Sequence, residues 1–230
     1  MVTGAAGALG SVTARRLAQR GAGVALVDRP EAVGALQALA KELGKAVAVP
    51  LDAASVDAWK EALGRIETEL GPSEGAALIA GTWQGGTALH AETDDKVWRA
   101  MMATNVDTAY ASLRALLPGM VARKKGAVVV IGSRAVEQPW TSASASAYAA
   151  SKSAVVALAK TVAAEVLADG VRVNAVLFST LDTNANRRVM PKADPSRWVS
   201  LESGAGVIAF LLSDEARDVS GAAVPVYGRA

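Results

Sequence analysis

A doubly wound parallel sheet with helices on both faces is the fold that this sequence predicts. Short apolar runs rich in Val, Ala and Leu alternate along the chain with longer segments whose apolar residues recur at helical spacing. Such runs are typical of strands buried on both faces, and their alternation with helices is typical of an α/β sheet. A glycine-rich turn directly after the first apolar run favours the same fold. Since no linker, repeat or charge run divides the chain, we expect one domain over residues 1–230.

The elements follow in order along the chain. The first strand has room for only two or three residues before the glycine turn, so either it is unusually short or upstream residues are absent from this sequence. Between the later strands, apolar residues such as Leu9 with Leu17, and Val155 with Val162, share one helical face. Three helical segments are followed by glycine, which is favoured at helix C-terminal caps: Gly21, Gly44 and Gly170. The remaining strands are expected at 23–28, 46–52, 76–81, 126–133, 171–177 and 222–228.

Composition narrows the classes of function. Hydrophobic residues make up 51% of the 230 residues and charged residues 20%, which suits a compact chain with a large core. The formal charge of +2 and the lack of a long basic run argue against nucleic acid, and no apolar run reaches the length of a membrane span. The absence of cysteine excludes disulfides and thiolate sites, and the single His90 gives a metal site little support. We therefore expect a cytoplasmic protein that acts on a small molecule without a metal.

The turn TGAAGALG, residues 3–10, has the features of a dinucleotide-binding turn. Gly4, Gly7 and Gly10 stand three apart between the first strand and the first helix. Glycine lets such a turn tighten, lets the backbone approach a pyrophosphate and lets the helix pack on the strand, while free N–H groups at the helix start meet the phosphate charge. A glycine-rich turn alone is weak evidence, but its place between a strand and a helix strengthens it.

Asp28 ends the next strand, about twenty residues further on, where a ribose-binding carboxylate is expected. It would accept hydrogen bonds from both hydroxyls of the adenosine ribose and repel a 2′-phosphate, which favours NAD(H). The neighbouring Arg29 could bind that phosphate, so NADP(H) stays open. Asp28 could also be only a turn residue before Pro30.

Several further motifs, in this order and spacing, resemble the short-chain dehydrogenase/reductase family over almost the whole chain. The resemblance implies a Rossmann fold and an NAD(P)-dependent oxidoreductase. Two expected asparagines are replaced by Leu78 and Ile79, and an expected Pro-Gly pair by Phe178 and Ser179. The matching pieces are the glycine turn, Asp28, Asp52, the Ala-Gly pair at 80–81, Asn105, Ser133, YAASK at 148–152 and RVNAV at 172–176.

Tyr148 and Lys152 in YAASK stand one helical turn apart, so their side chains share a face. The spacing alone also suits an ordinary helix start with a surface lysine. The resemblance instead implies that Tyr148 is the general acid and base. A free tyrosine has a pKa of about 10, and a nearby ammonium, with the positive nicotinamide ring of an oxidised cofactor, would lower it. Reaching a pKa near 7 would take about 4 kcal/mol of differential interaction.

The resemblance also implies supporting roles. Lys152 would bind the nicotinamide ribose, Ser133 would hold the substrate oxygen, and Asn105 would support a water chain to Lys152. The interval from Ser133 to Tyr148 is two residues longer than is common in the family, so three loop serines are rivals for the serine role: Ser142, Ser144 and Ser146. Besides the glycine turn with its Leu9, Asp28 and Arg29, the resemblance implies cofactor contacts in three places: Asp52 and Ala53 at the adenine, Ala80 and Gly81 at the ribose, and Leu181 and Thr183 at the nicotinamide amide.

Two stretches point to a substrate. IAGTWQGG at 79–86 and LDTNANRRVMPKADPSRW at 181–198 resemble one branch of the family, the quinoid dihydropteridine reductases, which reduce a flat pterin with NADH. The segment at about 181–200 would then cap the substrate, and Trp83, Trp140 and Trp198 would offer flat apolar walls. Core or interface packing explains each tryptophan equally well. That branch lacks a serine at the position of Ser133, so a ketone or 3-oxoacyl substrate stays open.

Two further hypotheses concern class and assembly. A non-catalytic sensor of the cofactor would be expected to lose Tyr148 or Lys152, and both are present. The helical segments 101–117 and 153–167 carry more apolar surface than one buried face requires. The resemblance implies that these helices pair with symmetry mates in a homodimer or homotetramer. The alternative is a monomer whose own sheet and helices cover this surface.

Overall fold

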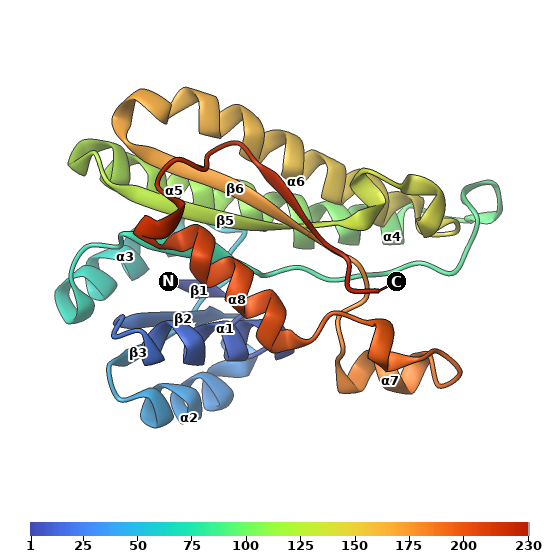
Figure 1. Cartoon of the computed structure of the whole chain (residues 1–230), viewed down its shortest axis with the longest axis horizontal. Helices are drawn as coiled ribbons and strands as arrows, with labels where there is room; N and C mark the ends of the chain where they lie inside the picture. Colours follow the sequence, from blue (N-terminus) through green and yellow to red (C-terminus); the bar gives the residue numbers. More distant parts are fainter. Residues whose placement is uncertain (230) are drawn as a thin grey trace.

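The computed structural model describes residues 1–229 and contains one parallel sheet of seven strands in the order β3-β2-β1-β4-β5-β6-β7 (Figure 1). The doubly wound sheet predicted from the sequence is confirmed, with every expected strand present. The strands are β1 Val2–Thr3, β2 Val24–Asp28, β3 Ala46–Pro50, β4 Gly75–Leu78, β5 Gly126–Ser133, β6 Val171–Phe178 and β7 Ala223–Val226.

Helices cover both faces of this sheet, as Figure 1 shows. On one face α3, α5 and α6 pack around a core that includes Trp59, whose indole N–H donates to the carbonyl oxygen of Ala53 at 3.0 Å. On the other face α1, α2 and α8 pack around a second core. The helices are α1 Ala8–Gln19, α2 Val33–Leu43, α3 Val56–Leu70, α4 Lys96–Met101, α5 Thr108–Arg123, α6 Ser146–Glu165, α7 Asn184–Val189 and α8 Leu201–Leu212.

Strand β5 shows why its sequence is apolar throughout. Val128 and Val130 belong to the core under α5 and α6, whereas Val129 between them belongs to the core under α1 and α8. Successive side chains of a strand point to opposite faces, and both faces are buried here. The run GAVVVIGS therefore needs no polar alternation.

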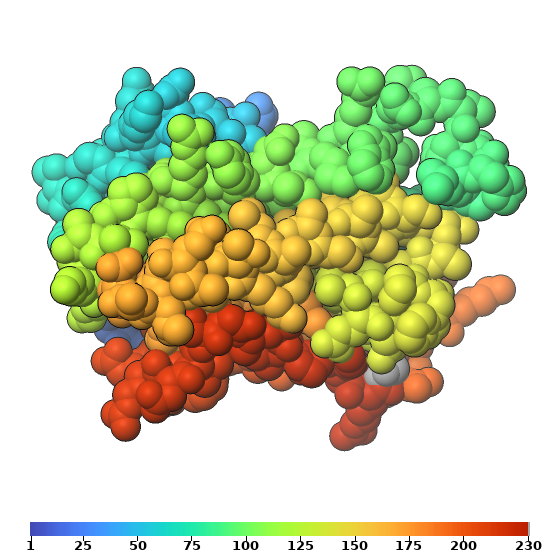
Figure 2. All heavy atoms as spheres, turned by 90° about the horizontal axis from the view of Figure 1, so that it is seen from above, coloured from blue at the N-terminus to red at the C-terminus, as the bar shows by residue number. Residues whose placement is uncertain are grey.

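Helices α4 and α5 are joined by a π-helical turn, Met102–Asp107, in place of the single helix that the apolar spacing suggested. Such turns are rare and occur mostly at functional sites. α5 and α6 lie side by side on the face seen in Figure 2, and the irregular loop 82–95 projects from the body beside them. Within residues 1–229, no helix is both long enough and apolar enough to cross a bilayer.

The strand order reverses between β1 and β4, which places a crevice at the carboxyl ends of these central strands. Although β1 has only two residues, both are buried and each pairs with β2 and β4. The hydroxyl of Thr3 accepts a hydrogen bond from the backbone N–H of Ala80 at 3.0 Å, which ties the ends of β1 and β4 together. The glycine turn and the segment after β4 therefore meet at the crevice.

Candidate active site

The glycine turn leaves no room for side chains. Gly4 has a φ of +66°, and a Cβ there would lie 3.0 Å from the backbone nitrogen of Ala80. A Cβ on Gly10 would lie 2.0 Å from the carbonyl oxygen of Gly4. Gly7 precedes the first turn of α1, which has neither a side-chain cap nor an acidic residue to satisfy it. This cradle of bare backbone at a helix N-terminus suits a pyrophosphate, so the residues present fit a dinucleotide.

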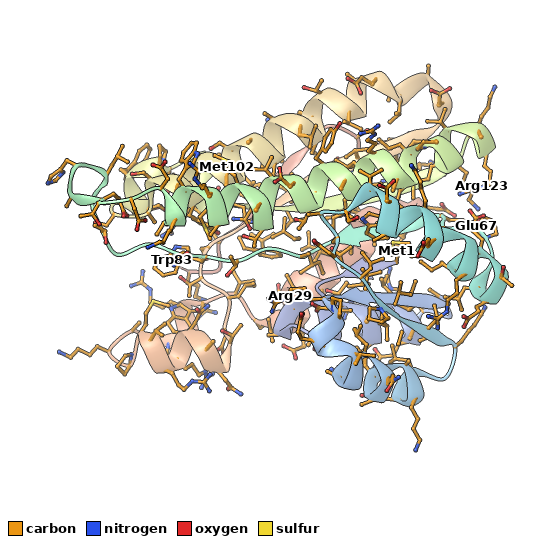
Figure 3. All side chains as sticks on the ribbon, turned by 180° about the vertical axis from the view of Figure 1, so that it is seen from behind. Met1, Arg29, Glu67, Trp83, Met102 and Arg123 are labelled. Atoms are coloured by element: carbon orange, nitrogen blue, oxygen red, sulfur yellow. The ribbon has the colours of Figure 1, made fainter. Side chains whose placement is uncertain are left out.

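Asp28 is held directly beside this turn. One carboxylate oxygen accepts a hydrogen bond from the backbone N–H of Ala6 at 2.9 Å, and the other accepts one from the backbone N–H of Arg29 at 2.8 Å. Each oxygen keeps further lone pairs for a ligand. The side chain of Arg29 is exposed on the same edge (Figure 3). After β3, Asp52 is exposed and its carboxylate accepts a hydrogen bond from the backbone N–H of Ala54 at 2.9 Å, whereas Ala53 is buried.

Lys152 is the most unusual charged residue of the site. Only 5% of it is exposed, and its ammonium donates one hydrogen bond to the carbonyl oxygen of Ile131 in β5 at 3.0 Å. Burial lowers the pKa of Lys152 to about 8, and no ion pair within residues 1–229 offsets it. Tyr148 lies one turn earlier on the same helix, in the first turn of α6.

Asn105, in the π-helical turn, is brought against Lys152 by the segment after β4. Its amide oxygen accepts from the backbone N–H of Thr82 at 2.9 Å, and its amide nitrogen donates to the carbonyl oxygen of Thr82 at 3.1 Å. A Cβ on Gly81 would lie 2.6 Å from the Asn105 oxygen and 3.2 Å from the Lys152 nitrogen. Glycine at 81 is thus required by the convergence of these two side chains.

Ser133 ends β5 and is buried, and its hydroxyl accepts from the backbone N–H of Ala135 at 3.2 Å. Burial raises the pKa of Tyr148, and a side-chain interaction with Ser133 opposes this rise. The structure therefore brings Ser133 to the phenol, because the longer interval is folded into two short 3-10 turns, Arg134–Val136 and Pro139–Ser142. Two of the rival serines, Ser144 and Ser146, line a cavity beside the first turn of α6.

The direction of the Tyr148 pKa corrects one expectation. The sequence predicted that the ammonium of Lys152 would lower this pKa, but in the structure the pKa is raised and Lys152 is not among its causes. The reason is that removal of the phenol from water disfavours the phenolate, while the ammonium is engaged with Ile131.

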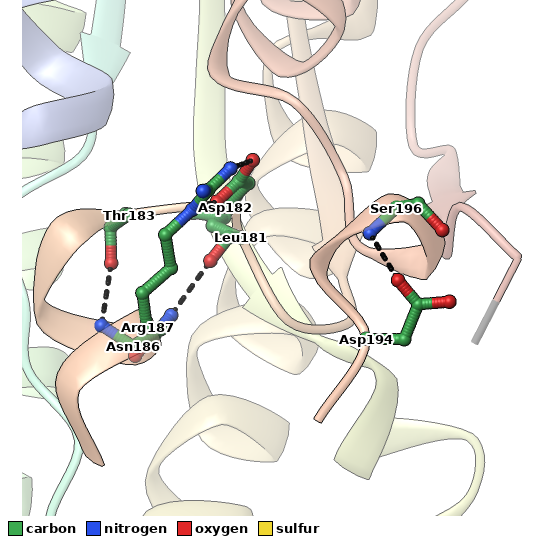
Figure 4. A network of polar contacts seen from close by, with 7 residues as sticks. All are labelled: Leu181, Asp182, Thr183, Asn186, Arg187, Asp194 and Ser196. Carbon is green, nitrogen blue, oxygen red and sulfur yellow. Dashed lines mark hydrogen bonds and ion pairs between the residues drawn. The ribbon is translucent and has the colours of Figure 1, made fainter. Parts of the chain in front are cut away.

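The two ends of the segment 181–200 meet at an isolated parallel bridge between Leu181 and Val199, which follows β6. Figure 4 shows its polar contacts: the hydroxyl of Thr183 accepts from the backbone N–H of Asn186 at 3.0 Å, and the Asn186 amide donates to the carbonyl oxygen of Leu181 at 2.8 Å. Arg187 forms two hydrogen bonds with Asp182, at 2.6 and 2.7 Å. Leu181 and Thr183 therefore lie together at the base of a folded segment that follows β6.

The three candidate substrate tryptophans differ in environment. Trp83 is 60% exposed and Trp140 is 73% exposed, so neither packs in the core of the chain, whereas Trp198 is partly buried. Trp83 stands on the loop that passes between the α4–α5 stretch and α7 (Figure 3). Its place is compatible with a wall above the capping segment.

Sequence reasoning missed several residues around the site. Ser151 is buried and contacts Asn105, and its only signal was its place inside YAASK. Tyr227 donates to Glu137 at 2.7 Å and so ties the segment after β7 to the loop after Ser133. A cavity of about 660 Å³ beside the first turn of α6 includes Trp98 and Leu89, which the periodicity did not single out.

A glycine cradle, an acidic strand end and a partly buried tyrosine one helical turn before a buried lysine, at one sheet edge, are features of a nicotinamide-dependent oxidoreductase. The short chain dehydrogenase family model matches residues 1–194. Galactitol 2-dehydrogenase (L-tagatose-forming) of Cereibacter sphaeroides is 36% identical, over 99% of this chain and 92% of that protein. The chain belongs to the short-chain dehydrogenase/reductase family.

Solved structures agree with this assignment. The 3-ketoacyl-(acyl-carrier-protein) reductase of Brucella melitensis, complexed with NADH, has a TM-score of 0.86 at 25% identity and covers 99% of this chain and 96% of its own. An NAD⁺-bound xylitol dehydrogenase has a TM-score of 0.88 at 26% identity, covering 99% and 95%. These relatives support a nicotinamide cofactor for this chain and an α/β oxidoreductase fold.

The buried ammonium predicts a pH-dependent stability. Below pH 8 the folded and unfolded chains both hold the Lys152 proton, and the full cost of burial applies. Between about 8 and 10.5 the unfolded state binds more protons, so this contribution makes stability rise with pH. Lys152→Met should therefore raise the free energy of unfolding at pH 7 by up to about 3 kcal/mol, with the gain shrinking as pH approaches 10.5. Urea titrations at several pH values measure it.

The matched control is Lys160→Met, which changes an exposed lysine on the same helix. It should leave the unfolding free energy nearly unchanged at every pH. A Lys152→Met variant that is no more stable than the unmodified protein at pH 7 would contradict the prediction. It would show that other interactions offset the free-energy cost of burying the Lys152 ammonium.

Proposed function

We propose that this enzyme transfers a hydride between NAD(H) and the carbonyl or secondary alcohol of a small molecule, with Tyr148 as general acid and base. The observation that carries the proposal is the convergence of the Lys152 and Asn105 side chains on Gly81, where a Cβ would meet both of them, beside Tyr148 and Ser133. The glycine cradle and Asp28 lie at the same sheet edge and would hold the adenosine half of the cofactor.

When bound, the nicotinamide supplies or accepts the hydride. The chain's own residues handle the oxygen and its proton. Ser133 would hold the substrate oxygen beside the phenol, and Tyr148 would donate its proton to that oxygen during reduction or take it during oxidation. The raised pKa of Tyr148 keeps the phenol protonated at neutral pH, which suits the reducing direction.

Lys152 would interact with both the cofactor and Tyr148. Its ammonium would bind the nicotinamide ribose and favour the phenolate once Tyr148 has given up its proton. Because its pKa is lowered to about 8, it can also return a proton to the phenol near neutral pH. Asn105 would hold the water chain that refills Lys152. The proposed contacts also include Leu9, Asp52, Ala53, Ala80, Leu181 and Thr183.

A ketone or secondary alcohol is the favoured substrate because Ser133 is present, buried and next to the phenol. The relatives named above act on galactitol, xylitol or a 3-ketoacyl group, all of which are alcohols or ketones. A 3-oxoacyl substrate is the first alternative. A quinonoid pterin is the second, with the segment 181–200 as cap and Trp83, Trp140 and Trp198 as walls. A non-catalytic sensor is disfavoured because Tyr148 and Lys152 are both retained, with the lysine buried.

Three test substrates distinguish a carbonyl reductase, a pterin reductase and a non-catalytic sensor. Purified protein is mixed with NADH and diacetyl, an acetoacetyl thioester or a quinonoid dihydropterin, and the absorbance of NADH is followed. Turnover of diacetyl or the thioester supports carbonyl chemistry, and turnover of the pterin alone supports the pterin branch. Binding of NADH without oxidation by any of the three would favour the sensor.

Tyr148→Phe should lower kcat by at least about a thousandfold while the Kd for NADH changes less than about threefold. The proton donor is lost, whereas the expected cofactor contacts come from other residues. Lys152→Ala should lower both turnover and affinity, because its ammonium serves the phenol and the ribose. Stopped-flow kinetics and NADH fluorescence titrations separate these effects. Most of the kcat surviving in Tyr148→Phe would refute the assignment.

The carboxylate of Asp28 should make NADH the preferred reductant. Asp28→Ala removes its repulsion of a 2′-phosphate and should narrow the ratio of kcat/KM for NADH over NADPH by about tenfold or more. Arg29→Ala is the matched variant, since it removes the one nearby cation and should widen that ratio. An unmodified protein that already prefers NADPH would show that Arg29 determines cofactor choice.

For assembly we propose at least a twofold dimer through α5 and α6. The apolar residues of segment 101–117 suggested this dimer from the sequence, but their burial does not support it. Met101, Leu113 and Leu116 are buried within the chain, and Met102 and Leu117 are partly buried. Support comes instead from Trp98 and Tyr110, which are about half exposed on α4 and α5. Exposed aromatic side chains on two successive helices favour an interface.

Light scattering at micromolar concentration should give at least twice the mass of one chain, which is 23.4 kDa. Tyr110→Glu would place a charge in the proposed contact and should shift the protein towards the monomer. Gln37→Glu is the control, because it adds one negative charge at an exposed position of α2, on the opposite face of the sheet. A mass near 23.4 kDa for the unmodified protein would overturn the dimer.

A further inference from the structure

We propose that Ser151 is a positioning residue that sets the orientation of the Asn105 amide and so holds the segment after β4 against the catalytic helix. The inference rests on the proposed function, since it concerns the same site. Ser151 is fully buried in α6, between Tyr148 and the π-helical turn that carries Asn105.

The hydrogen bonds of Ser151 have only one consistent direction. Its hydroxyl lies 2.8 Å from the carbonyl oxygen of Tyr148 and 3.0 Å from the side-chain amide of Asn105. A carbonyl oxygen can only accept, and a serine hydroxyl has a single hydrogen, so that hydrogen is used on Tyr148. The hydroxyl can therefore only accept from Asn105, and the NH₂ end of the amide must face it.

Donation from the Asn105 NH₂ group to Ser151 determines where the amide oxygen of Asn105 lies. With its NH₂ group towards Ser151, Asn105 presents its oxygen to the backbone N–H of Thr82 at 2.9 Å, and its nitrogen also reaches the carbonyl oxygen of Thr82 at 3.1 Å. Thr82 lies beyond the end of β4 and has no strand partner. The amide therefore supplies both hydrogen bonds that a neighbouring strand would have given.

A reversed amide would disrupt the site. Its NH₂ group would face the N–H of Thr82, so two donors would oppose each other in a partly buried place. The Asn105 oxygen would also leave its position beside Gly81, where a Cβ would meet both Asn105 and the ammonium of Lys152. Ser151 thus acts through Asn105 on the backbone of Gly81 and Thr82, which follows β4 at the carboxyl edge of the sheet.

A serine that only packs in a helix would be expected to bond a backbone carbonyl and no side chain. Ser153 bonds the carbonyl oxygen of Ala149 at 2.9 Å on the exposed side of the same helix. Ser112 is buried in α5 and bonds the carbonyl oxygen of Thr108 at 2.6 Å. Within residues 1–229, neither hydroxyl has a side-chain partner. The acceptor bond to Asn105 is what distinguishes Ser151.

The experiment is a double-mutant cycle of Ser151→Ala and Asn105→Ala, read by kcat/KM for NADH with diacetyl or whichever of the three substrates is turned over. Ser151→Ala should lower kcat/KM by about tenfold in the unmodified protein and by less than about twofold in the Asn105→Ala background. Ser112→Ala and Ser153→Ala should stay within about twofold of the unmodified enzyme. Equal factors in the two backgrounds, or no loss in Ser151→Ala, would overturn the proposal.

Hydrogen exchange gives a second readout that needs no activity. In Ser151→Ala the amide of Thr82 should exchange at least about tenfold faster, because the group it bonds is no longer held. The amide of Ala80 bonds Thr3 instead and should be unchanged. Unchanged exchange at Thr82 in a folded Ser151→Ala protein would overturn the inference. Turnover retained in Tyr148→Phe would instead overturn the catalytic assignment, so the two failures are distinguishable.

Discussion

The structure of the active site depends on a lysine ammonium buried at the carboxyl edge of the sheet. Lys152 has one backbone acceptor, Ile131, and its pKa falls to about 8 because water is excluded. A buried charge of this kind lowers stability, and such costs are tolerated mainly where the charge has a function. A Cβ at position 81 would clash with Asn105 and lie close to the Lys152 ammonium, so only glycine fits there. The Asn105 amide oxygen accepts from the backbone N–H of Thr82 and so holds this segment in place.

The sheet order explains why the remaining parts meet there. Reversal between β1 and β4 opens a crevice at the carboxyl ends, and the glycine turn, Asp28 and the segment after β4 all border it. β5 ends next to them and delivers both Ser133 and the carbonyl oxygen that receives Lys152. Residues distant in sequence therefore act at one edge because each follows a parallel strand.

Apolar runs and turn chemistry predicted the sheet, the glycine cradle and the Tyr-Lys helix, because these depend on local spacing. Contacts between distant elements were less predictable. Met101, Leu113 and Leu116 were counted as excess surface, yet they are buried, since periodicity cannot say how many neighbours a helix has. The π-helical turn at Asn105 leaves no mark in the spacing, and the direction of the Tyr148 pKa follows from burial that spacing does not reveal. The sequence also did not show that two short 3-10 turns take up the longer interval between Ser133 and Tyr148.

We propose that one edge of the sheet binds the cofactor and performs the proton transfer. A crystal structure of the complex with NADH would be the sharpest test. We expect the pyrophosphate at the N-terminus of α1, the adenosine ribose on Asp28, and the nicotinamide ribose within hydrogen-bonding distance of Lys152. A dinucleotide bound elsewhere, or one whose nicotinamide ribose leaves Lys152 bonded to Ile131 alone, would contradict it.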